Sequence, residues 1–214
     1  MVTETDSVQT LIQAVEAADS AAGLVQAVRA LAMAKEAAAI PTLIAVLGFN
    51  NPGAAVAAVD GLVQLGAIAV PALLEQLDGY NYGARAWAIR ALALIGDPRA
   101  LTVLVETARG DFALSVRRAA AKGLGNIQWQ AMVPEEAEPA QAAAQAALLV
   151  ALQDPEWVVR YAAVVGLSGL VAAQVLGEEA VQTCLAALTQ CSHQDEETVV
   201  RARASWAIAQ LSPP

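Results

Sequence analysis

Aromatic and basic residues are scarce in this chain. Only 4% of its 214 residues are aromatic, and 12 lysines and arginines stand against 21 aspartates and glutamates, a formal net charge of −9. Non-specific binding to nucleic acid needs a basic surface that displaces counterions from phosphates. The charge balance therefore argues against a nucleic-acid partner. No convincing stretch alternates β-branched with polar residues, so we expect no β-strands.

Cysteine and histidine are rarer still, since the chain holds only Cys184, Cys191 and His193. On one helix the two cysteine Cα atoms would lie about 10 Å apart, beyond the roughly 7 Å limit for a disulfide. Two reduced thiols are typical of a cytoplasmic protein. Zinc takes four ligands, usually with tighter cysteine spacings. We therefore expect no metal site, and we interpret the thiols as small apolar side chains of the core.

Charge is absent from residues 37–59, a stretch long enough to suggest a membrane span. Pro41, Pro52 and Gly53 interrupt it, so two buried helices joined by a turn explain it better. The N-terminus is acidic and lacks the basic start and apolar core of a signal peptide. We expect no membrane span and a cytoplasmic location.

What the chain does contain is a repeated helix, in which a small residue precedes an aliphatic one. These pairs begin at positions 30, 61, 91, 123, 166 and 207, at successive offsets of 31, 30, 32, 43 and 41 residues. A fixed period of this size predicts a repeat architecture, here an all-α, right-handed α-solenoid of about six helix pairs in a single domain over residues 1–214. Expected outer helices are 7–18, 37–48, 67–78, 98–109, 139–153 and 178–191. Expected inner helices are 21–34, 52–65, 83–95, 114–128, 157–171 and 198–211.

An aspartate precedes an arginine by six residues in three of the turns between outer and inner helices. The pairs are Asp111 with Arg117, Asp154 with Arg160, and Asp195 with Arg201. The aspartate can cap the inner helix, and the arginine can reach this aspartate or its equivalent in the next repeat. We predict a structural role for these pairs, with ligand contact as the alternative.

The period is broken once, by about eleven extra residues near 128–140. Loops on a rigid scaffold often carry specificity. We expect a loop insertion here, in which Trp129 could cover a ligand. The alternative is a solvated acidic loop.

Two stretches make the repeats similar to a known family. Residues 77–92, Leu-Asp-Gly-Tyr-Asn-Tyr-Gly-Ala-Arg-Ala-Trp-Ala-Ile-Arg-Ala-Leu, and residues 110–125, Gly-Asp-Phe-Ala-Leu-Ser-Val-Arg-Arg-Ala-Ala-Ala-Lys-Gly-Leu-Gly, resemble the F-type subunits of heterodimeric E/F phycocyanobilin lyases. These are HEAT-like repeat proteins, and the resemblance covers nearly the whole chain. A related branch also isomerises the bilin and carries adjacent His and Cys. Here the order is Cys191-Ser192-His193, which favours a simple lyase.

The resemblance implies a lyase (C–S bond forming or breaking) that is active only with an E-type partner subunit. It would bind phycocyanobilin as substrate and direct its thioether attachment to a cysteine of the phycocyanin α subunit. The nucleophile then belongs to the acceptor, and we assign no catalytic residue to this chain. Two alternatives stay open. One is a non-catalytic adaptor or chaperone for phycobiliproteins, and the other is a HEAT-like DNA glycosylase, which the acidic balance disfavours.

A bilin offers two propionates and a flat apolar skeleton. Arginine forks suit carboxylates, and aromatic faces suit the rings. In the aligned inner helices Arg90 and Lys122 share one column just before the small–aliphatic pair, and Arg118 shares a face with Lys122. We predict that these three bind the bilin. The alternative is that they are solvated helix edges.

The third turn carries a second candidate cluster. Tyr80 and Tyr82 lie between Asp78 and Arg85, so we predict a site where a bilin ring stacks on an aromatic side chain. Turn packing, or contact with the partner subunit, would explain the same residues.

Overall fold

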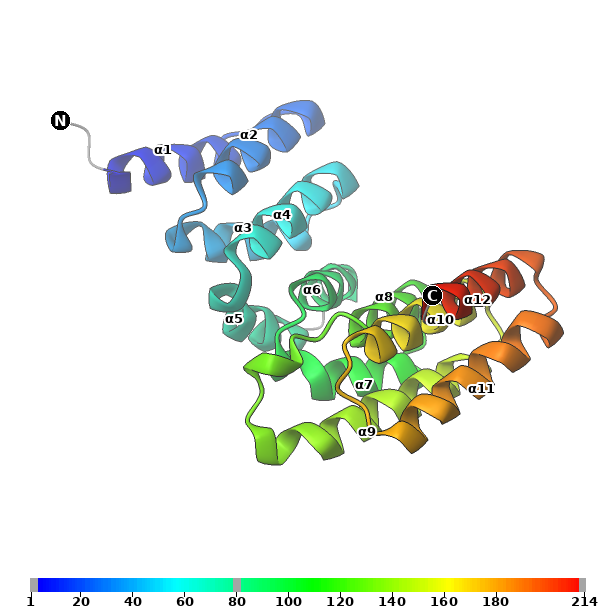
Figure 1. The fold of residues 1–214 in the computed structure, drawn as a ribbon. Helices are drawn as coiled ribbons and strands as arrows, with labels where there is room; N and C mark the ends of the chain where they lie inside the picture. Colours follow the sequence, from blue (N-terminus) through cyan, green and yellow to red (C-terminus); the bar gives the residue numbers. More distant parts are fainter. Residues whose placement is uncertain (1–3, 79–81, 212–214) are drawn as a thin grey trace. The chain divides into compact units, whose positions relative to one another are not determined.

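The computed structural model describes residues 4–78 and 82–211. Within these residues the chain forms twelve α-helices and five short 3₁₀ helices, with no β-strand. The helices follow one another as six antiparallel pairs (Figure 1). This confirms the predicted all-α solenoid of helix pairs. The chain divides into two compact units, residues 1–95 and 96–214, and the single domain over residues 1–214 stays a prediction.

Unit 1 contains three helix pairs. Their bounds are α1 Glu4–Glu16, α2 Ala21–Ala34, α3 Ile40–Leu47, α4 Pro52–Leu65, α5 Val70–Glu75 and α6 Tyr82–Ile95. The outer helices α3 and α5 are short because 3₁₀ turns open them, η1 at Ala37–Ala39 and η2 at Gly66–Ala69, and η3 (Gln76–Asp78) follows α5. The inner helix α4 packs between α2 and α6.

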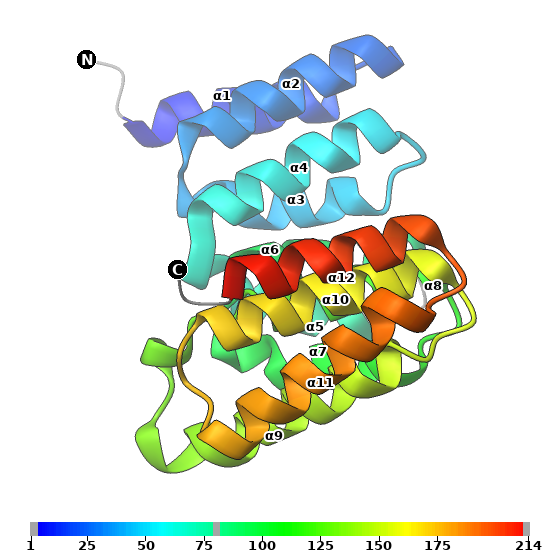
Figure 2. The same cartoon turned by 45° about the vertical axis from the view of Figure 1, so that its right-hand side comes forward.

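Unit 2 contains the other three pairs. Their bounds are α7 Leu101–Gly110, α8 Leu114–Leu124, α9 Pro134–Ala151, α10 Trp157–Ala172, α11 Glu178–Gln194 and α12 Thr198–Leu211, with η4 at Pro98–Ala100 and η5 at Trp129–Ala131. The inner helix α10 packs between α8 and α12, and the outer helix α9 contacts both α7 and α11. Figure 2 shows the three inner helices of this unit as one layer and the outer helices as another.

Local chemistry fixes where these helices begin and end. Asn51 caps α4 by accepting from the Ala54 amide at 3.1 Å, and its side-chain amide donates to the Ala21 carbonyl at 3.1 Å, which ties α4 to α2. Gly66 and Gly96 have φ of 65° and 70°, a left-handed conformation that glycine adopts at low cost. Both follow inner helices, where glycine is favoured just after the last helical residue. Gly177, by contrast, precedes the outer helix α11 and has a φ of −66°.

Each inner helix buries one stripe of apolar side chains three or four residues apart. In α8 the side chains of Val116, Ala120 and Leu124 are buried. Helices α8 and α10 approach so closely that a Cβ on Gly166 would collide with the backbone of α8. Glycine at this crossing therefore sets the distance between the two helices.

The insertion differs from its expectation. The inner helix expected at 114–128 ends at Leu124, where Gly125 follows, and the Gln128 amide donates to the Gly96 carbonyl at 2.8 Å. Helix α9 then begins at Pro134 rather than at residue 139. Proline is favoured at the first position of a helix, and acidic residues suit the first turn. The expected loop over 128–140 is thus wrong for residues 134–140, which are the first turns of a longer outer helix.

One apolar run deserves comparison with a membrane span. Pro52–Glu75 is long enough to span a membrane, and an 18-residue window within it has a mean hydropathy of 1.8. Gly66 breaks the run between α4 and η2, and α4 packs between α2 and α6. Packing inside unit 1 therefore accounts for its apolar composition.

Candidate functional site

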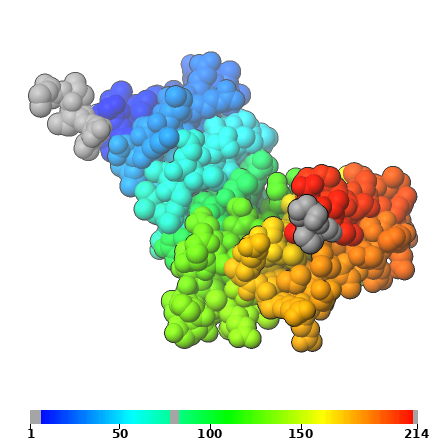
Figure 3. Space-filling view, viewed as in Figure 1, coloured from blue at the N-terminus to red at the C-terminus, as the bar shows by residue number. Residues whose placement is uncertain are grey.

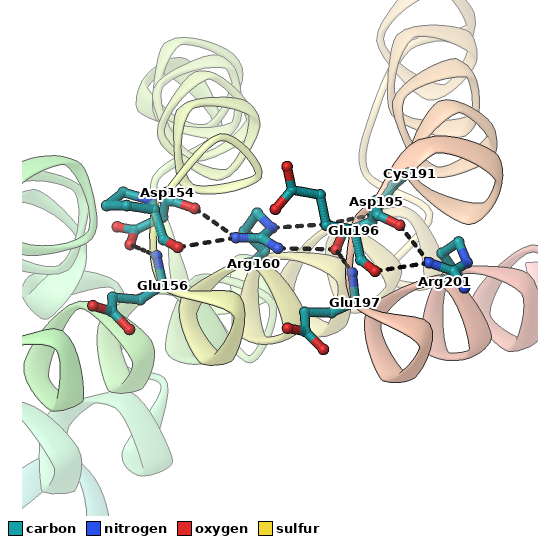
Figure 4. A network of polar contacts seen from close by, with 9 residues as sticks. Asp154, Glu156, Arg160, Cys191, Asp195, Glu196, Glu197 and Arg201 are labelled. Carbon is teal, nitrogen blue, oxygen red and sulfur yellow. Dashed lines mark hydrogen bonds and ion pairs between the residues drawn. The ribbon is translucent and has the colours of Figure 1, made fainter.

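A ladder of arginine–aspartate pairs links the helix pairs of unit 2. Arg117 donates through Nε and Nη2 to the two carboxylate oxygens of Asp154, at 2.7 and 3.0 Å. Arg160 makes the same two bonds to Asp195, at 2.7 and 3.0 Å. Each arginine therefore reaches the equivalent aspartate of the next repeat, one of the two partners that the sequence predicts. Figure 4 shows Arg160 between Asp154 and Asp195, with Arg201 beyond them.

The third guanidinium nitrogen of each arginine holds its own turn. Nη1 of Arg160 donates to the Asp154 and Pro155 carbonyls at 3.0 and 3.2 Å. Nη1 of Arg201 donates likewise to the Asp195 and Glu196 carbonyls at 2.6 and 3.0 Å. One guanidinium thus joins a local turn to a distant one, which explains why arginine rather than lysine suits this position.

Contrary to the prediction, the aspartates do not cap the inner helices directly but accept from a backbone amide of the turn that precedes each helix. Asp154 accepts from the Glu156 amide at 2.9 Å, and Asp195 accepts from the Glu197 amide at 2.9 Å. Each is an Asx turn that leads the chain into the inner helix. The hydrogen bond from Arg160 holds the pKa of Asp195 below its ordinary value. Burial alone would raise the pKa of Asp154, but its bonds to Arg117 and to the Glu156 amide lower it overall.

The three ladder arginines occupy equivalent positions in α8, α10 and α12, because each donates to the carbonyls five and six residues before it. Surface residues of the three helices can therefore be matched by counting from these arginines. Positions one and five after each arginine then share one side of α8, α10 and α12. We call these six residues the α8–α10–α12 face. They are Arg118, Lys122, Tyr161, Val165, Ala202 and Trp206.

The α8–α10–α12 face changes in character from one helix to the next. Arg118 and Lys122 are exposed on α8, whereas Tyr161 and Val165 are half-buried on α10. On α12 the indole of Trp206 is 54% exposed. Because α10 lies between its two neighbours, the face is basic at one side and aromatic at the other. It can offer cations to carboxylates and apolar surface to flat rings.

Arg203 supports the aromatic side of this face. Its guanidinium carbon lies 4.4 Å from the centroid of the Trp206 ring, within the range of a cation–π contact. Its Nη1 is buried and has no hydrogen-bond acceptor among the described residues. Such a buried donor costs free energy while it is unpaired.

The predicted basic residues fall into both units. Arg118 and Lys122 belong to unit 2, and Arg90 is an exposed residue of α6 in unit 1, where its guanidinium carbon lies 5.5 Å from the Trp87 ring centroid. Arg85 is half-buried on the same helix. The structure thus brings Arg118 and Lys122 together on α8 of unit 2, whereas Arg90 belongs to unit 1.

The aromatic cluster of the third turn lies largely outside the described residues. This holds for Tyr80 and for the side chains of Asp78 and Tyr82. The ring-stacking site there stays a prediction. Trp129 is only 4% exposed, and its indole nitrogen has no acceptor among the described residues. Its burial favours core packing over the covering of a ligand.

The two thiols are free, and Cys184 is buried in unit 2 while Cys191 is half-buried. Burial, and then the charge of Asp195, raise the pKa of Cys191 to about 11. Burial also raises the pKa of Cys184. Both are therefore weak nucleophiles at neutral pH, because the thiolate is the reactive form. The described residues hold no group of three or more His, Cys, Asp or Glu that could bind a metal, and the expected lack of a metal stays a prediction.

Sequence reasoning missed Tyr161 and Arg203 as surface residues of interest. A usable signal existed, since Arg203 and Trp206 are three apart on one helix and therefore neighbours. Tyr161 could have been found by counting from the ladder arginines, one position after Arg160.

Comparisons with known proteins bear on this geometry. The family model of HEAT repeats matches residues 70–168. The chain is 52% identical to "Phycocyanin alpha phycocyanobilin lyase CpcF" of Synechocystis sp. PCC 6803, over 98% of this chain and 96% of that protein. It is 54% identical to "Phycobilisome maturation protein" of Synechococcus elongatus PCC 7942, over 94% of this chain and 97% of that protein.

A solved structure is similar at the level of both sequence and fold. It is the complex of CpcE and CpcF of phycocyanin lyase from Nostoc sp. PCC7120. One of its chains superimposes with a TM-score of 0.74 at 52% identity, over 80% of this chain and 99% of that chain.

Proposed function

The chain belongs to the family of HEAT-like repeat phycobilin lyase subunits represented by CpcF, and from this premise we propose that it is the F-type subunit of a phycocyanobilin lyase. With an E-type partner it binds phycocyanobilin and directs thioether attachment to a cysteine of the phycocyanin α subunit. The lyase works in the cytoplasm as a heterodimer, on a bilin substrate and without a metal.

The chemistry that this role demands is positioning. The acceptor thiol adds across the ethylidene double bond of the bilin, so that one C–S bond forms and no leaving group or oxidant is needed. The proteins must hold the bilin in one orientation and stabilise charge on it. Neither thiol of this chain is suited to carry the bilin, because the pKa of each is raised.

The observation that carries the proposal is the α8–α10–α12 face. Arg118 and Lys122 would hold the propionates at its basic side. Tyr161, Val165 and Trp206 would contact the flat ring system at its aromatic side. A bilin presents carboxylates and a flat apolar ring system in one molecule, which matches the two sides of this face.

Unit 1 supplies further candidate residues. Arg90 is exposed and next to Trp87, a second pairing of a cation with an aromatic ring. We keep Arg90 and Arg85 as proposed bilin-binding residues, together with the turn residues Asp78, Tyr80 and Tyr82. Trp129 remains a weaker proposal because its ring is buried.

The proposal is tested by reconstitution, read by absorbance and fluorescence. This chain, an E-type subunit, phycocyanobilin and the apo α subunit are mixed, and each component is omitted in turn. We expect a covalent, fluorescent adduct only when both repeat proteins are present. An equal rate and product without this chain would contradict the proposal.

Substitutions on the α8–α10–α12 face sharpen this test. Lys122→Ala and Trp206→Ala should each weaken bilin binding about tenfold, as the loss of one charge-assisted bond or one stacked ring predicts. Arg109→Ala is the control, because Arg109 is also exposed but lies in the last turn of the outer helix α7. Wild-type affinity in both face variants, with normal helicity, would contradict the assignment.

One observation favours a second candidate. The Synechococcus elongatus relative is described more broadly as a maturation protein, which suits an adaptor that binds phycobiliproteins without transferring bilin. The same reconstitution separates the two functions. An adaptor would bind the α subunit yet leave the attachment rate unchanged.

A further inference from the structure

Arg201, the third arginine of the ladder, has no carboxylate hydrogen-bond partner among the described residues. Arg117 and Arg160 each use Nε and Nη2 to bind both oxygens of an aspartate in the next repeat. Arg201 keeps the same carbonyl bonds through Nη1. Its Nη2 instead donates to the Thr198 hydroxyl at 2.9 Å, and its Nε has no acceptor among the described residues.

The two filled positions define what the third would accept. In both, the acceptor is a carboxylate from the turn before an inner helix, held rigid by a backbone amide two residues later. The carboxylate approaches in the plane of the guanidinium and accepts two parallel bonds, the geometry that makes arginine selective for carboxylates. Because the local carbonyls already fix the Arg201 guanidinium, little side-chain entropy would be lost on binding.

The acceptor does not come from a second copy of this chain stacked head to tail. In the filled positions the aspartate stands three residues before the first residue of the inner helix, as Asp154 does before Trp157. At the first inner helix of this chain, α2, that position is Ala18. Asp19 lies one residue out of register. A second copy of this chain therefore offers no carboxylate in register before α2.

We infer that Arg201 is a binding site for the carboxylate of an acidic turn in a second, different helical-repeat chain. Figure 3 shows the orange and red surface of α11 and α12 at one edge of unit 2. The inference rests on the proposed function, since the E-type subunit is the partner to which it assigns this turn. Arg201 is not one of the six residues of the α8–α10–α12 face, and we assign it to assembly rather than to the bilin.

The test is a titration of this chain with the CpcE subunit of Nostoc sp. PCC7120, the partner named with CpcF in the solved complex. We expect Arg201→Gln to weaken the heterodimer about tenfold or more, as truncating one side of a charge-assisted bidentate pair does. The control is Arg109→Gln, which removes an equal charge from unit 2 outside the ladder. It should change the dissociation constant less than twofold. Thermal unfolding by circular dichroism shows whether each variant is folded.

A second measurement leaves this chain unaltered. Each turn aspartate of the CpcE subunit is changed to asparagine, and its effect is combined with Arg201→Gln in a double-mutant cycle. One of these aspartates should lose its effect once Arg201 is gone. Additive effects at every turn would overturn the inference.

The remaining outcomes are equally decisive. Equal affinity in Arg201→Gln and Arg109→Gln, with bilin transfer intact, would overturn the inference while leaving the proposed function standing. Self-association that depends on Arg201 would assign the site to a second copy and also overturn it. A complex that depends on Arg201 but transfers no bilin would support the inference and refute the proposed function. Absence of any complex would overturn both.

Discussion

Replacing Arg160 by glutamine should destabilise unit 2 by about 3 kcal/mol. The side chains of Arg160 and Asp195 are only 13% and 5% exposed. The substitution removes two bonds to Asp195 and two to the carbonyls of Asp154 and Pro155. Removing one partner of a buried ion pair costs about 3–5 kcal/mol, because the other charge stays buried and unpaired. Residual access to water places Arg160→Gln near the lower limit.

Arg201→Gln is the matched comparison within the same molecule. It removes two carbonyl bonds and one bond to Thr198 but leaves no carboxylate without a partner. Net losses of about 0.5–1.5 kcal/mol for each bond, which do not add fully, predict about 1–2 kcal/mol. The two arginine variants should therefore differ by roughly 1–2 kcal/mol, a factor of about 5–30 in the ratio of folded to unfolded protein.

Urea unfolding measures this difference. A Trp87→Phe background places every remaining tryptophan in unit 2, so indole emission reports the unfolding of that unit alone. The free energy of unfolding is extrapolated to water for each variant. Equal losses in Arg160→Gln and Arg201→Gln would refute the reasoning, because the ladder carboxylate would then contribute nothing beyond the local turn.

Three further predictions concern pH, thiol chemistry and packing. Since Arg160 lowers the pKa of Asp195, the ionised carboxylate stabilises the folded protein above its unfolded pKa, and this stabilisation is lost as pH falls below about 4. In Asp195→Asn the free energy of unfolding in urea should therefore depend less on pH over that range. A pH dependence equal to that of the unaltered protein would contradict the argument. Because the pKa of Cys191 is about 11, iodoacetamide should modify it slowly at pH 8 and faster above about pH 10, as mass spectrometry would show; rapid modification at pH 8 would contradict this. Gly166→Ala should destabilise unit 2 by about 1–3 kcal/mol through overpacking against α8, whereas Gly110→Ala, which meets no atom within 4 Å, should not show that overpacking loss in thermal unfolding.

The sequence predicts most bounds of the inner helices correctly for a physical reason. Helices that pack in a regular stack must repeat their buried positions, so one period locates every pair. The expected inner helices 21–34, 52–65 and 198–211 match α2, α4 and α12 at both ends. The spacing of six between Asp154 and Arg160 also indicates a bond to a neighbouring repeat, because a turn and the first helical turn fix their separation.

The insertion was harder because its composition points two ways. Two prolines and three glutamates over residues 134–139 are typical of a solvated loop. The same residues suit the start of a helix, where proline lacks an amide that would be unpaired anyway and acidic side chains face the positive end of the helix dipole. Only packing against α7 and α11 decides between them.

Candidate site residues were only partly predictable. Lys122 and Arg118 follow from helical spacing, and both are exposed as a binding role requires. The stacking of Arg203 on Trp206 depends on side-chain rotamers, which periodicity does not specify. The buried state of Trp129 likewise depends on how the chain folds back after Gly125, a tertiary effect that local sequence does not encode.

The arginine–aspartate ladder also means that no helix pair contains both partners of a ladder ion pair, because each such ion pair joins an arginine of one repeat to an aspartate of the next. A helix pair cut at its own boundaries would carry an arginine whose carboxylate stays behind on the following pair, and an aspartate whose arginine stays behind on the preceding one. Whole helix pairs could therefore be deleted, duplicated or exchanged with related proteins only where the new neighbouring helix pair supplies the missing arginine or aspartate. These ion pairs between successive helix pairs give the array a direction and a fixed order. Apolar packing between near-identical helices alone would not impose either.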